Sequence, residues 1–400
     1  MKFMPYEKSL EILAKNTIKW DRIEKVTITN ALNRYLAIDI IAKDNYPSHP
    51  TSAMDGYAIK HSEIENGSFT ILGDVPAGAL KDVELGKFEC IKTFTGSLMS
   101  KNSDTLVPVE NVEVFDNTIK IIKEVPKGFA VREIGESYKK GEILIKKGTK
   151  LSYSEIALLA ELGEIFVSVY IKPKVAILAT GSEIKDIGEP LENEAQIRSS
   201  NHVALKAMME LMGCEPMILP IVKDEPNLVE NAILQGLRSC DILLTTGGVS
   251  MGDYDFVKTA LSKNCNVIIN GAAIKPGRHI KISKIDEKYI FSLPGFPYSA
   301  MVMCILYVRV LINSFFSIND NYEVNAVMDS DFTKKSKFLE FSACTLYADK
   351  KGILKVSLKG KKDGSSAIVN NLNQNAALLI TPLESTGHKK GDVVKVLKMV

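Results

Sequence analysis

The sequence has few of the side chains that bind soft metal ions. Its six cysteines, at positions 90, 214, 240, 265, 304 and 344, lie far apart and form no C-x-x-C pair. Its five histidines are scattered and form no H-E-x-x-H motif. A zinc site or a redox dithiol normally needs ligands that lie closer together in the sequence. We therefore expect reduced, mostly buried thiols, and any bound metal should be held by oxygen atoms.

An excess of charge of either sign is also absent. Fifty basic residues face forty-eight acidic ones, so the net charge is +2. A chain that binds nucleic acid or an anionic membrane usually shows a clustered basic excess, so we expect neither partner. The lysine pairs at 334–335 and 361–362 are short enough to be interpreted as solvated loop charges.

Long apolar runs are missing as well. The first ten residues, MKFMPYEKSL, lack the apolar core of a secretory signal. The longest apolar stretch, from Ala300 to Phe316, is interrupted by Arg309 and Asn313 and is short for a membrane span. With 46% apolar and 24% charged residues over 400 positions, the composition is typical of a globular chain of two to four domains. These features predict a cytoplasmic protein.

The region from about 172 to 316 alternates between short apolar runs and amphipathic segments. Each apolar run predicts a buried strand, at Lys174–Thr180, Pro216–Val222, Asp241–Thr246 and Asn266–Ile269. Helices are predicted between them, with Asn201, Asp224 and Asp253 as candidate N-caps. This alternation predicts right-handed crossovers and a mostly parallel, doubly wound α/β sheet. The following segments predict a paired edge and a long covering helix, at His279–Ile285, Tyr289–Leu293 and Pro297–Phe315.

The flanking regions have a different pattern. Residues 41–139 consist of short alternating runs separated by Gly and Pro, which predicts a small β domain. A strand-like segment and a helix, Tyr153–Leu162, are expected between 140 and 170. Residues 323–400 predict a second β module, for which a barrel is one solution. Because no low-complexity linker separates these parts, we interpret the β domain at 41–139 as an insertion.

Two glycine turns follow strands of the predicted sheet. Gly181-Ser182-Glu183 follows the first strand, and the turn that begins with Gly247-Gly248 follows the third. Ligands of open α/β sheets bind beyond the carboxyl ends of the strands, where glycine lets backbone N–H groups approach a phosphate. The alternative is that these glycines only make tight turns. Neither turn matches a P-loop or a G-x-G-x-x-G dinucleotide motif.

Acidic residues flank both turns: Glu183, Asp224, Asp253 and Asp255. Carboxylates beside a phosphate repel it unless a cation lies between them, and Mg²⁺ is commonly bound by one or two carboxylates together with phosphate oxygens. The alternative is that Asp224 and Asp253 are only helix caps.

Further motifs are individually weak. Lys275 and Arg278 surround a Pro-Gly turn and would suit an oxyanion, or would simply be solvated. The turn at 293–297 offers backbone amides before a helix. The segment at 51–58 reads as an Asx-type turn, and the segment at 93–97 places hydroxyls at a glycine turn.

Taken together, six segments carry a specific resemblance. They are SAMDGYA at 52–58, FTG at 94–96, TGSE at 180–183, TGGVSMGDYD at 246–255, IKPG at 274–277 and LPG-x-P at 293–297. In this order and spacing the chain resembles the MoeA/gephyrin family. The resemblance implies a dimer of four-part subunits. The parts are a pterin-binding sheet domain (1–21 plus 171–316), a connecting domain (22–40 plus 140–170), an inserted β domain (41–139) and a C-terminal β-barrel (321–400).

The resemblance also implies a reaction, the Mg²⁺-dependent insertion of molybdate into adenylated molybdopterin with release of AMP. It implies six catalytic residues, of which Glu183, Asp224 and Asp255 would also hold the metal: Asp55, Thr95, Glu183, Asp224, Asp255 and Lys275. It implies nine residues that bind the cofactor: Gly181, Ser182, Gly247, Gly248, Ser250, Arg278, Pro294, Gly295 and Ser365. The implied partners are a second subunit that completes each active site, the pterin adenylating enzyme and acceptor molybdoenzymes.

Some positions depart from the family pattern. Phe296 stands where asparagine is usual, Gly271 where a basic residue is common, and Arg278 where lysine is usual, while Lys337 matches the barrel's basic positions only in part. These departures leave the choice between molybdate and tungstate open. Three alternatives remain: a pterin adenylyltransferase, a non-catalytic pterin-binding scaffold, and a hydrolase of another phosphoanhydride. The first is disfavoured because single-domain adenylating enzymes lack the two β modules.

Overall fold

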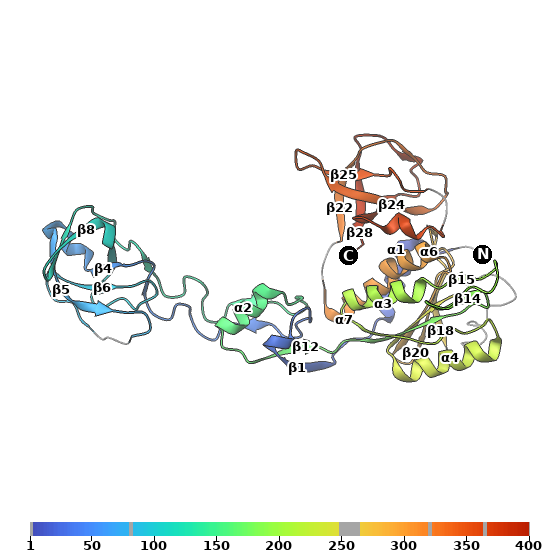
Figure 1. Ribbon diagram of the computed structural model, residues 1–400, viewed down its shortest axis with the longest axis horizontal. Coiled ribbons are helices and arrows are strands. Elements are labelled where there is room, and N and C mark those ends of the chain that lie inside the picture. Colours follow the sequence, from blue (N-terminus) through green and yellow to red (C-terminus); the bar gives the residue numbers. More distant parts are fainter. Residues whose placement is uncertain (1–2, 80–82, 248–264, 319–321, 363–365, 400) are drawn as a thin grey trace. The chain divides into compact units, whose positions relative to one another are not determined.

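The computed structural model describes residues 3–79, 83–247, 265–318, 322–362 and 366–399. The chain forms two compact units, one made of residues 1–37 and 148–400 and the other of residues 38–147. The larger unit contains an α/β sheet and a barrel, and the smaller unit is a β domain (Figure 1). The limits of the four domains given above remain a prediction.

The α/β sheet has six strands in the order β16-β13-β17-β21-β20-β18. In this order the strands are Glu215–Ile218, Lys174–Ala179, Ile242–Thr246, Lys288–Leu293, Lys281–Ile285 and Asn266–Asn270. The first four are parallel, and β20 and β18 each pair antiparallel with the preceding strand. The predicted mostly parallel sheet is confirmed. The predicted pairing of His279–Ile285 with Tyr289–Leu293 is confirmed, because β20 and β21 pair antiparallel. Their predicted edge position is wrong, because β18 lies outside β20 and β21 lies inside the sheet, buried along almost its whole length, as its apolar run requires.

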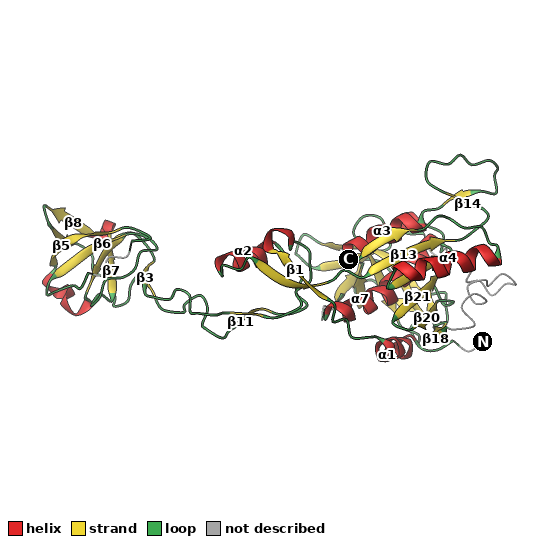
Figure 2. Ribbon diagram, turned by 90° about the horizontal axis from the view of Figure 1, so that it is seen from below, coloured by secondary structure: helices red, strands yellow, loops and turns green. Residues whose placement is uncertain are grey.

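Helices cover both faces of this sheet (Figure 2). The side chains of β13 alternate between the two faces. Val175 and Ile177 belong to a core cluster with residues of α3 (Asn201–Leu211). Ala176 and Leu178 belong to a second cluster with residues of α4 (Pro226–Ser239). Because successive side chains of a strand point to opposite faces, the sheet is buried on both sides.

A long apolar helix crosses the core of the larger unit. It consists of α6 (Pro297–Met303), a π-helical turn (Cys304–Val308) and α7 (Arg309–Phe316). Among the described residues it is the one helix long and apolar enough to cross a membrane, and 78% of its most apolar window is buried within the protein. Arg309 lies buried in it and donates hydrogen bonds to the carbonyls of Lys398 and Met399 at 2.9 and 2.7 Å. The predicted covering helix is therefore a core helix.

Two predicted helix caps are wrong. Glu225 rather than Asp224 precedes α4, because Pro226 occupies the first helical position, where its fixed φ and missing N–H fit best. Ser200 rather than Asn201 precedes α3, and Asn201 is the first residue of that helix. The side chains of Asp224 and Asn201 are thus free for other roles.

The C-terminal strands close into a five-stranded barrel, which confirms the barrel prediction. Around the barrel they run β24, β25, β22, β28 and β26, and β26 pairs back onto β24. In this order the strands are Leu339–Ala348, Leu354–Ser357, Glu323–Met328, Val393–Lys398 and Ala376–Thr381. A short strand, β19 (Ile274–Lys275), pairs in parallel with β24 and places Lys275 opposite Glu340. The basic turn of the sheet domain is thereby joined to the barrel.

The remaining elements of the larger unit complete its packing. They are the helices α1 (Tyr6–Asn16) and α2 (Tyr153–Glu161) and three two-stranded pairs. The pairs are β1 (Ile23–Thr27) with β12 (Phe166–Tyr170), β14 (Ile184–Lys185) with β15 (Ile197–Arg198), and β23 (Phe332–Thr333) with β27 (Gly387–His388). The helix α2 begins with a capping box of Ser152 and Glu155. The single tryptophan, Trp20, is buried and stacks on Phe315 with ring centroids 4.7 Å apart.

The smaller unit is built on a six-stranded sheet in the order β7-β4-β6-β5-β9-β8. In this order the strands are Thr105–Pro108, Gly56–Ile59, Glu89–Thr93, Ser68–Val75, Thr118–Ile121 and Val112–Phe115. Two further short strand pairs lie outside this sheet. They are β3 (Thr51–Ser52) with β10 (Val131–Arg132) and β2 (Ile40–Ile41) with β11 (Ile143–Ile145). The short alternating runs predicted in this region form strands, as at β5, β6, β7, β8 and β9. The turn predicted at 51–58 is instead two strands, β3 and β4, with Asp55 between them. Gly56 lies so close to the neighbouring strand that a Cβ atom would come within 2.4 Å of the Val107 carbonyl oxygen.

The thiol prediction is confirmed. All six cysteines are free, and all except Cys265 are buried.

Candidate functional site

Three glycines meet at the carboxyl end of the parallel strands. Thr180, which follows β13, donates its backbone N–H to Thr246 at the end of β17 at 3.0 Å. Gly247 follows immediately, with φ +93°, and a Cβ atom there would lie 2.4 Å from the Thr180 carbonyl oxygen. A Cβ atom on Gly295 would lie 3.7 Å from Gly247 Cα, and Gly181 follows Thr180. A backbone surface without side chains therefore lies at the edge where ligands of such sheets bind.

Two carboxylates border this surface. The Glu183 carboxylate lies against Gly181, with its oxygens 2.9 and 3.0 Å from the position that a Cβ atom would take there. The Asp224 backbone N–H lies 3.4 Å from Ser182 Oγ, and the Gly181 N–H donates to the Val222 carbonyl at 3.0 Å. Glu183 and Asp224 therefore flank the same turn.

These carboxylates fit an oxygen-ligated magnesium ion. Asp224 Oδ1 is buried and has no hydrogen-bond partner among the described residues, so it can serve as a ligand. Carboxylate oxygens are the ligands that Mg²⁺ prefers. Within the described ranges no three residues of the types His, Cys, Asp and Glu form a cluster. The third predicted ligand, Asp255, lies outside the described residues, as does Asp253.

Other buried polar atoms near this edge also lack a hydrogen-bond partner in the described part of the chain. They are Thr180 Oγ1, Thr245 Oγ1 and Asn201 Oδ1. Asn201 is only 5% exposed, and its Nδ2 donates to the Gly295 carbonyl at 2.7 Å. An unpaired buried polar atom costs roughly 1–3 kcal/mol, so several at one strand edge indicate a place where a ligand supplies the missing partners.

Sequence reasoning missed Asn201 and Thr180 as candidate functional residues. The sequence predicts Asn201 as a cap, although Ser199 and Ser200 directly precede it and already have good capping chemistry. Because two serines can already cap the helix, the sequence indicates that the Asn201 side chain is not needed as a cap.

In the smaller unit, the structure brings two of the motif segments together. Ser52 donates its N–H to the Ser97 carbonyl at 2.9 Å, and Gly96 donates its N–H to the Ser52 carbonyl at 2.8 Å. The Thr95 N–H and Oγ–H both donate to Asp55 Oδ1, at 2.8 and 2.9 Å. These hydrogen bonds, the backbone one foremost, hold the pKa of the exposed Asp55 carboxyl below its usual range. Asp55 is therefore an oriented, ionised carboxylate.

A cavity of about 280 Å³ lies between the basic turn of the sheet domain and the barrel. Lys275, Pro276 and Tyr298 line it from the sheet domain. The barrel supplies the remaining charged and hydroxyl groups of its wall: Asp331, Thr333, Lys335, Glu340, Ser342, Lys361, Lys362 and Ser366. Four lysines thus face two carboxylates, and the cavity is suited to a small anion.

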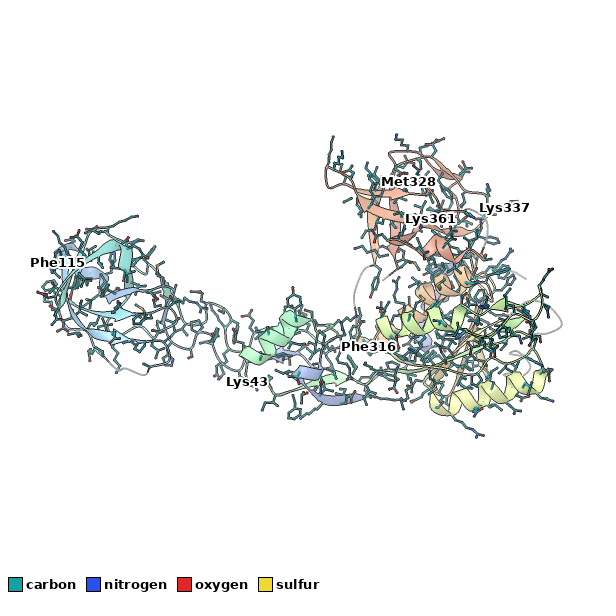
Figure 3. The ribbon with its side chains drawn as sticks, in the orientation of Figure 1. Lys43, Phe115, Phe316, Met328, Lys337 and Lys361 are labelled. Carbon is teal, nitrogen blue, oxygen red and sulfur yellow. The ribbon has the colours of Figure 1, made fainter. Side chains whose placement is uncertain are left out.

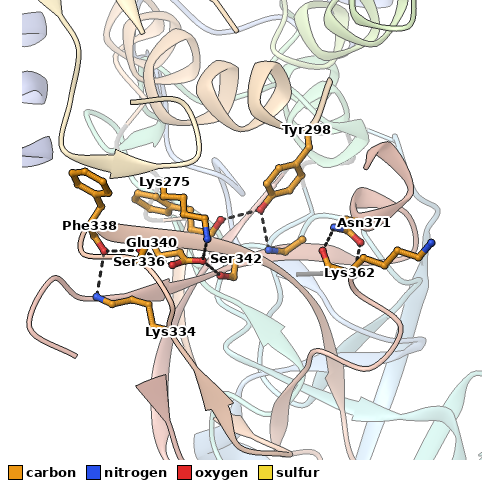
Figure 4. A network of polar contacts seen from close by, with 11 residues as sticks. Lys275, Tyr298, Lys334, Ser336, Phe338, Glu340, Ser342, Lys362 and Asn371 are labelled. Carbon is orange, nitrogen blue, oxygen red and sulfur yellow. Dashed lines mark hydrogen bonds and ion pairs between the residues drawn. The ribbon is translucent and has the colours of Figure 1, made fainter. Parts of the chain in front are cut away.

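Lys275 does not face this cavity as a free cation. Its Nζ lies 3.0 Å from Glu340 Oε1, and Glu340 is only 3% exposed (Figure 4). Ser336 Oγ donates to Glu340 Oε2 at 2.6 Å, and Ser342 Oγ donates to Oε1 at 3.3 Å. Glu340 is a third functional candidate that sequence reasoning missed, since it lies 65 residues from Lys275 along the chain.

The prediction that the lysine pairs are solvated loop charges is wrong for one member of each pair. Lys334 is buried, and its ammonium group donates to the carbonyls of Phe338, Leu383 and Pro382. Lys361 donates to the carbonyls of Asn371 and Asn373 at 2.8 and 3.1 Å, and burial lowers its pKa. Both lysines hold loops of the barrel in place. Lys337, by contrast, is exposed on the barrel (Figure 3).

The other predicted cofactor-binding residues divide into two groups. Arg278 is exposed, and its guanidinium lies 5.6 Å from the centroid of the Phe338 ring, while Pro294 directly precedes Gly295 at the strand edge. Gly248, Ser250 and Ser365 lie outside the described residues.

The sequence of this chain resembles those of known proteins. The family described as "MoeA N-terminal region (domain I and II)" matches residues 4–163, and the family described as "Probable molybdopterin binding domain" matches residues 176–313. A Haemophilus influenzae protein named molybdopterin molybdenumtransferase is 33% identical over 291 residues, which are 72% of each chain. A Bacillus subtilis protein of the same name is 29% identical over 95% of this chain and 90% of its own.

A solved structure extends the likeness to the whole fold. The molybdopterin biosynthesis MoeA protein of Pyrococcus horikoshii OT3 superposes with a TM-score of 0.84 at 29% identity, over 99% of this chain and 100% of that one. The chain therefore belongs to the MoeA family, of which the relatives named above are called molybdopterin molybdenumtransferases.

Proposed function

We propose that this chain inserts molybdate into adenylated molybdopterin in the cytoplasm, with Mg²⁺ as its metal and AMP as the released product. The observation that carries the proposal is the pairing of two binding surfaces in one unit. The glycine edge suits a phosphate-bearing ligand, and the lysine-lined cavity suits an oxyanion. Gly295 of the edge and Tyr298 of the cavity are only three residues apart, so the LPGFP turn connects the two.

The glycine edge would bind the pterin phosphoanhydride. Without side chains at Gly181, Gly247 and Gly295, backbone N–H groups can approach phosphate oxygens closely. Glu183 and Asp224, together with Asp255, would hold Mg²⁺, which supplies charge neutralisation at the anhydride when bound. The unpartnered atoms of Thr180 and Asn201 would accept hydrogen bonds from the pterin side of the ligand.

The lysine-lined cavity would hold molybdate next to the dithiolene sulfurs. Lys275 and the barrel lysines provide N–H donors with positive charge, and Ser342 provides a hydroxyl. Charge-assisted hydrogen bonds of this kind are the strongest that a protein offers a tetrahedral oxyanion. A cavity of about 280 Å³ has room for such a dianion with bound water.

Asp55 and Thr95 would act from the inserted domain of a second subunit. Asp55, ionised and fixed by Thr95, would orient a water molecule for attack on the anhydride. In a two-fold dimer each site would then combine residues of both chains. The Asp55→Ala and Asp255→Ala homodimers should each be nearly inactive, whereas a purified mixed dimer carries both lesions in one site and should recover roughly half of wild-type activity by symmetry. Mixed dimers as inactive as their parents would refute the composite site.

The main alternative, pterin adenylation, is separated by its products. The protein is given either molybdopterin with ATP, or adenylated molybdopterin with molybdate, each with Mg²⁺. The proposal expects AMP from the second mixture and no pyrophosphate from the first. Pyrophosphate formation would support the adenylyltransferase, and an inactive protein that still binds the pterin would support a scaffold. The pterin adenylating enzyme and acceptor molybdoenzymes are the protein partners that the proposal requires before and after this step.

A further inference from the structure

Glu340 places a buried negative charge in the wall of a cavity that otherwise favours anions. Its side chain is 4% exposed, and it lines the cavity together with Lys275. The two residues are register partners of the β19–β24 pairing, so the ladder itself holds the carboxylate beside the ammonium group. The position of this ion pair is therefore set by the backbone.

The Glu340 carboxylate is also fully engaged. Its Oε1 accepts from Lys275 Nζ and Ser342 Oγ, and its Oε2 accepts from Ser336 Oγ. Ser336 lies in the loop that the buried Lys334 fixes through the Phe338 carbonyl. A group held by three donors and a rigid loop does not leave the cavity when an anion enters, so its charge stays there.

Such a fixed charge has two opposite effects on a bound oxyanion. It holds the Lys275 ammonium group at the cavity wall, where the anion meets it. It also repels the anion, and the repulsion is twice as large for a dianion as for a monoanion of the same shape. The two effects can be separated by changing the charge of the anion while keeping its tetrahedral shape.

We propose that Glu340 is a positioning residue that orients Lys275 and keeps the binding of dianions in this cavity weak, so that the oxyanion can be passed on rather than retained. This inference rests on the proposed role of the cavity as the oxyanion site.

The test is equilibrium binding of oxyanions alone to the full-length protein, by titration calorimetry. Molybdate and tungstate are the dianions, and perrhenate is the tetrahedral monoanion. Glu340→Gln keeps the size of the side chain and an oxygen acceptor for Lys275, but removes the charge. It should tighten dianion binding on the order of tenfold and perrhenate binding by only about the square root of that factor, about threefold. Glu323→Gln, which removes the same charge at the barrel's surface pair with Lys395, should change neither.

A second variant keeps the charge and changes its surroundings. Ser336→Ala removes the donor to Oε2 and leaves Lys275 as the carboxylate's main partner, so dianion binding should weaken severalfold. This result is required even if Glu340→Gln fails to fold. Lys275→Ala should abolish binding.

The outcomes separate the inference from the function on which it rests. If the wild type binds no oxyanion, or Lys275→Ala binds as the wild type does, the cavity is not the oxyanion site. The proposed binding of molybdate in this cavity is then wrong. If binding depends on Lys275 but Glu340→Gln does not tighten it, or tightens monoanions and dianions equally, Glu340 is only structural and the inference is wrong. Unchanged binding in Ser336→Ala contradicts it as well.

Discussion

Asn201→Ala tests whether the glycine edge is assembled as a ligand site. The substitution removes the hydrogen bond from Asn201 Nδ2 to the Gly295 carbonyl, which ties the start of α3 to the LPGFP turn at 2.7 Å. It also removes the buried Oδ1, which lacks a partner among the described residues. The first loss should lower stability, and the second should lower affinity for the ligand that supplies the missing donor.

The expected loss of stability can be worked out from this contact. Asn201 is buried, but Gly295 is exposed, so water can reach the carbonyl that loses its donor. The cost should then be in the lower part of the usual range, roughly 1–2 kcal/mol. With a urea m-value of roughly 1–3 kcal/mol per molar, the unfolding midpoint should fall by about 0.3–2 M.

The assay is urea unfolding followed by the fluorescence of the single tryptophan. Trp20 packs on Phe315 of the core helix, so its signal reports the larger unit. The matched control is Asn16→Ala at the end of α1, which also loses a side-chain hydrogen bond to a carbonyl, that of Ile12 at 2.9 Å. Both variants should lose stability, but only Asn201→Ala should bind the pterin substrate about tenfold more weakly, the effect of roughly 1.4 kcal/mol. Wild-type affinity in Asn201→Ala would refute the assignment of this edge as the ligand site.

Three further predictions follow from individual contacts. Gly247→Ala should lower the free energy of unfolding by at least roughly 1–2 kcal/mol and abolish AMP release, because the φ of Gly247 is +93° and a Cβ atom there would meet the Thr180 carbonyl. The control is Gly163→Ala, where φ is +72° and nothing lies near the added Cβ atom. That variant should lose only the stability that the left-handed backbone conformation costs, and should stay active. Equal effects of the two on activity would contradict the close approach. Thr95→Val removes one hydrogen-bond donor to Asp55, so the pKa of Asp55 should rise towards its ordinary value. The acidic limb of the pH–kcat/KM profile should therefore move to higher pH. An acidic limb at its wild-type pH would mean that Asp55 is not the titrating group. Exhaustive treatment with EDTA should abolish AMP release and added Mg²⁺ should restore it, whereas activity that survives metal removal would exclude the role given to Glu183 and Asp224.

The sheet could be predicted from the sequence because its strands are short apolar runs that end at glycine. The runs before Gly181 and Gly247 are buried on both faces, so no other element fits them, and parallel strands bring their carboxyl ends to one edge. The position of β21 was missed although its residues are apolar on both faces, a pattern that also indicates an interior strand. The strands around Asp55 were missed because they are only two and four residues long and contain Ser52, Gly56 and Ala58, which have low strand propensity. Gly56 is nevertheless required in β4, where the neighbouring strand leaves no room for a Cβ.

The contacts of the cavity could not be predicted in the same way. The Lys275–Glu340 pair depends on the register between β19 and β24, which joins residues far apart in the chain and is not encoded in any local pattern. The buried positions of Lys334 and Lys361 depend likewise on carbonyls supplied by distant loops. Local sequence reasoning treats such lysines as solvated because burial of an ammonium group is favourable only when these partners are already in place.

The most direct test of the central claim is to measure AMP release and pterin-bound molybdenum together in one reaction. Purified protein is incubated with adenylated molybdopterin and Mg²⁺, with and without molybdate, and both products are quantified. A molybdenum insertase should release one AMP for each molybdenum atom bound to the pterin, and should release little AMP without molybdate. AMP release at the same rate without molybdate, or with no molybdenum on the pterin, would show that the chain hydrolyses the anhydride without inserting the metal.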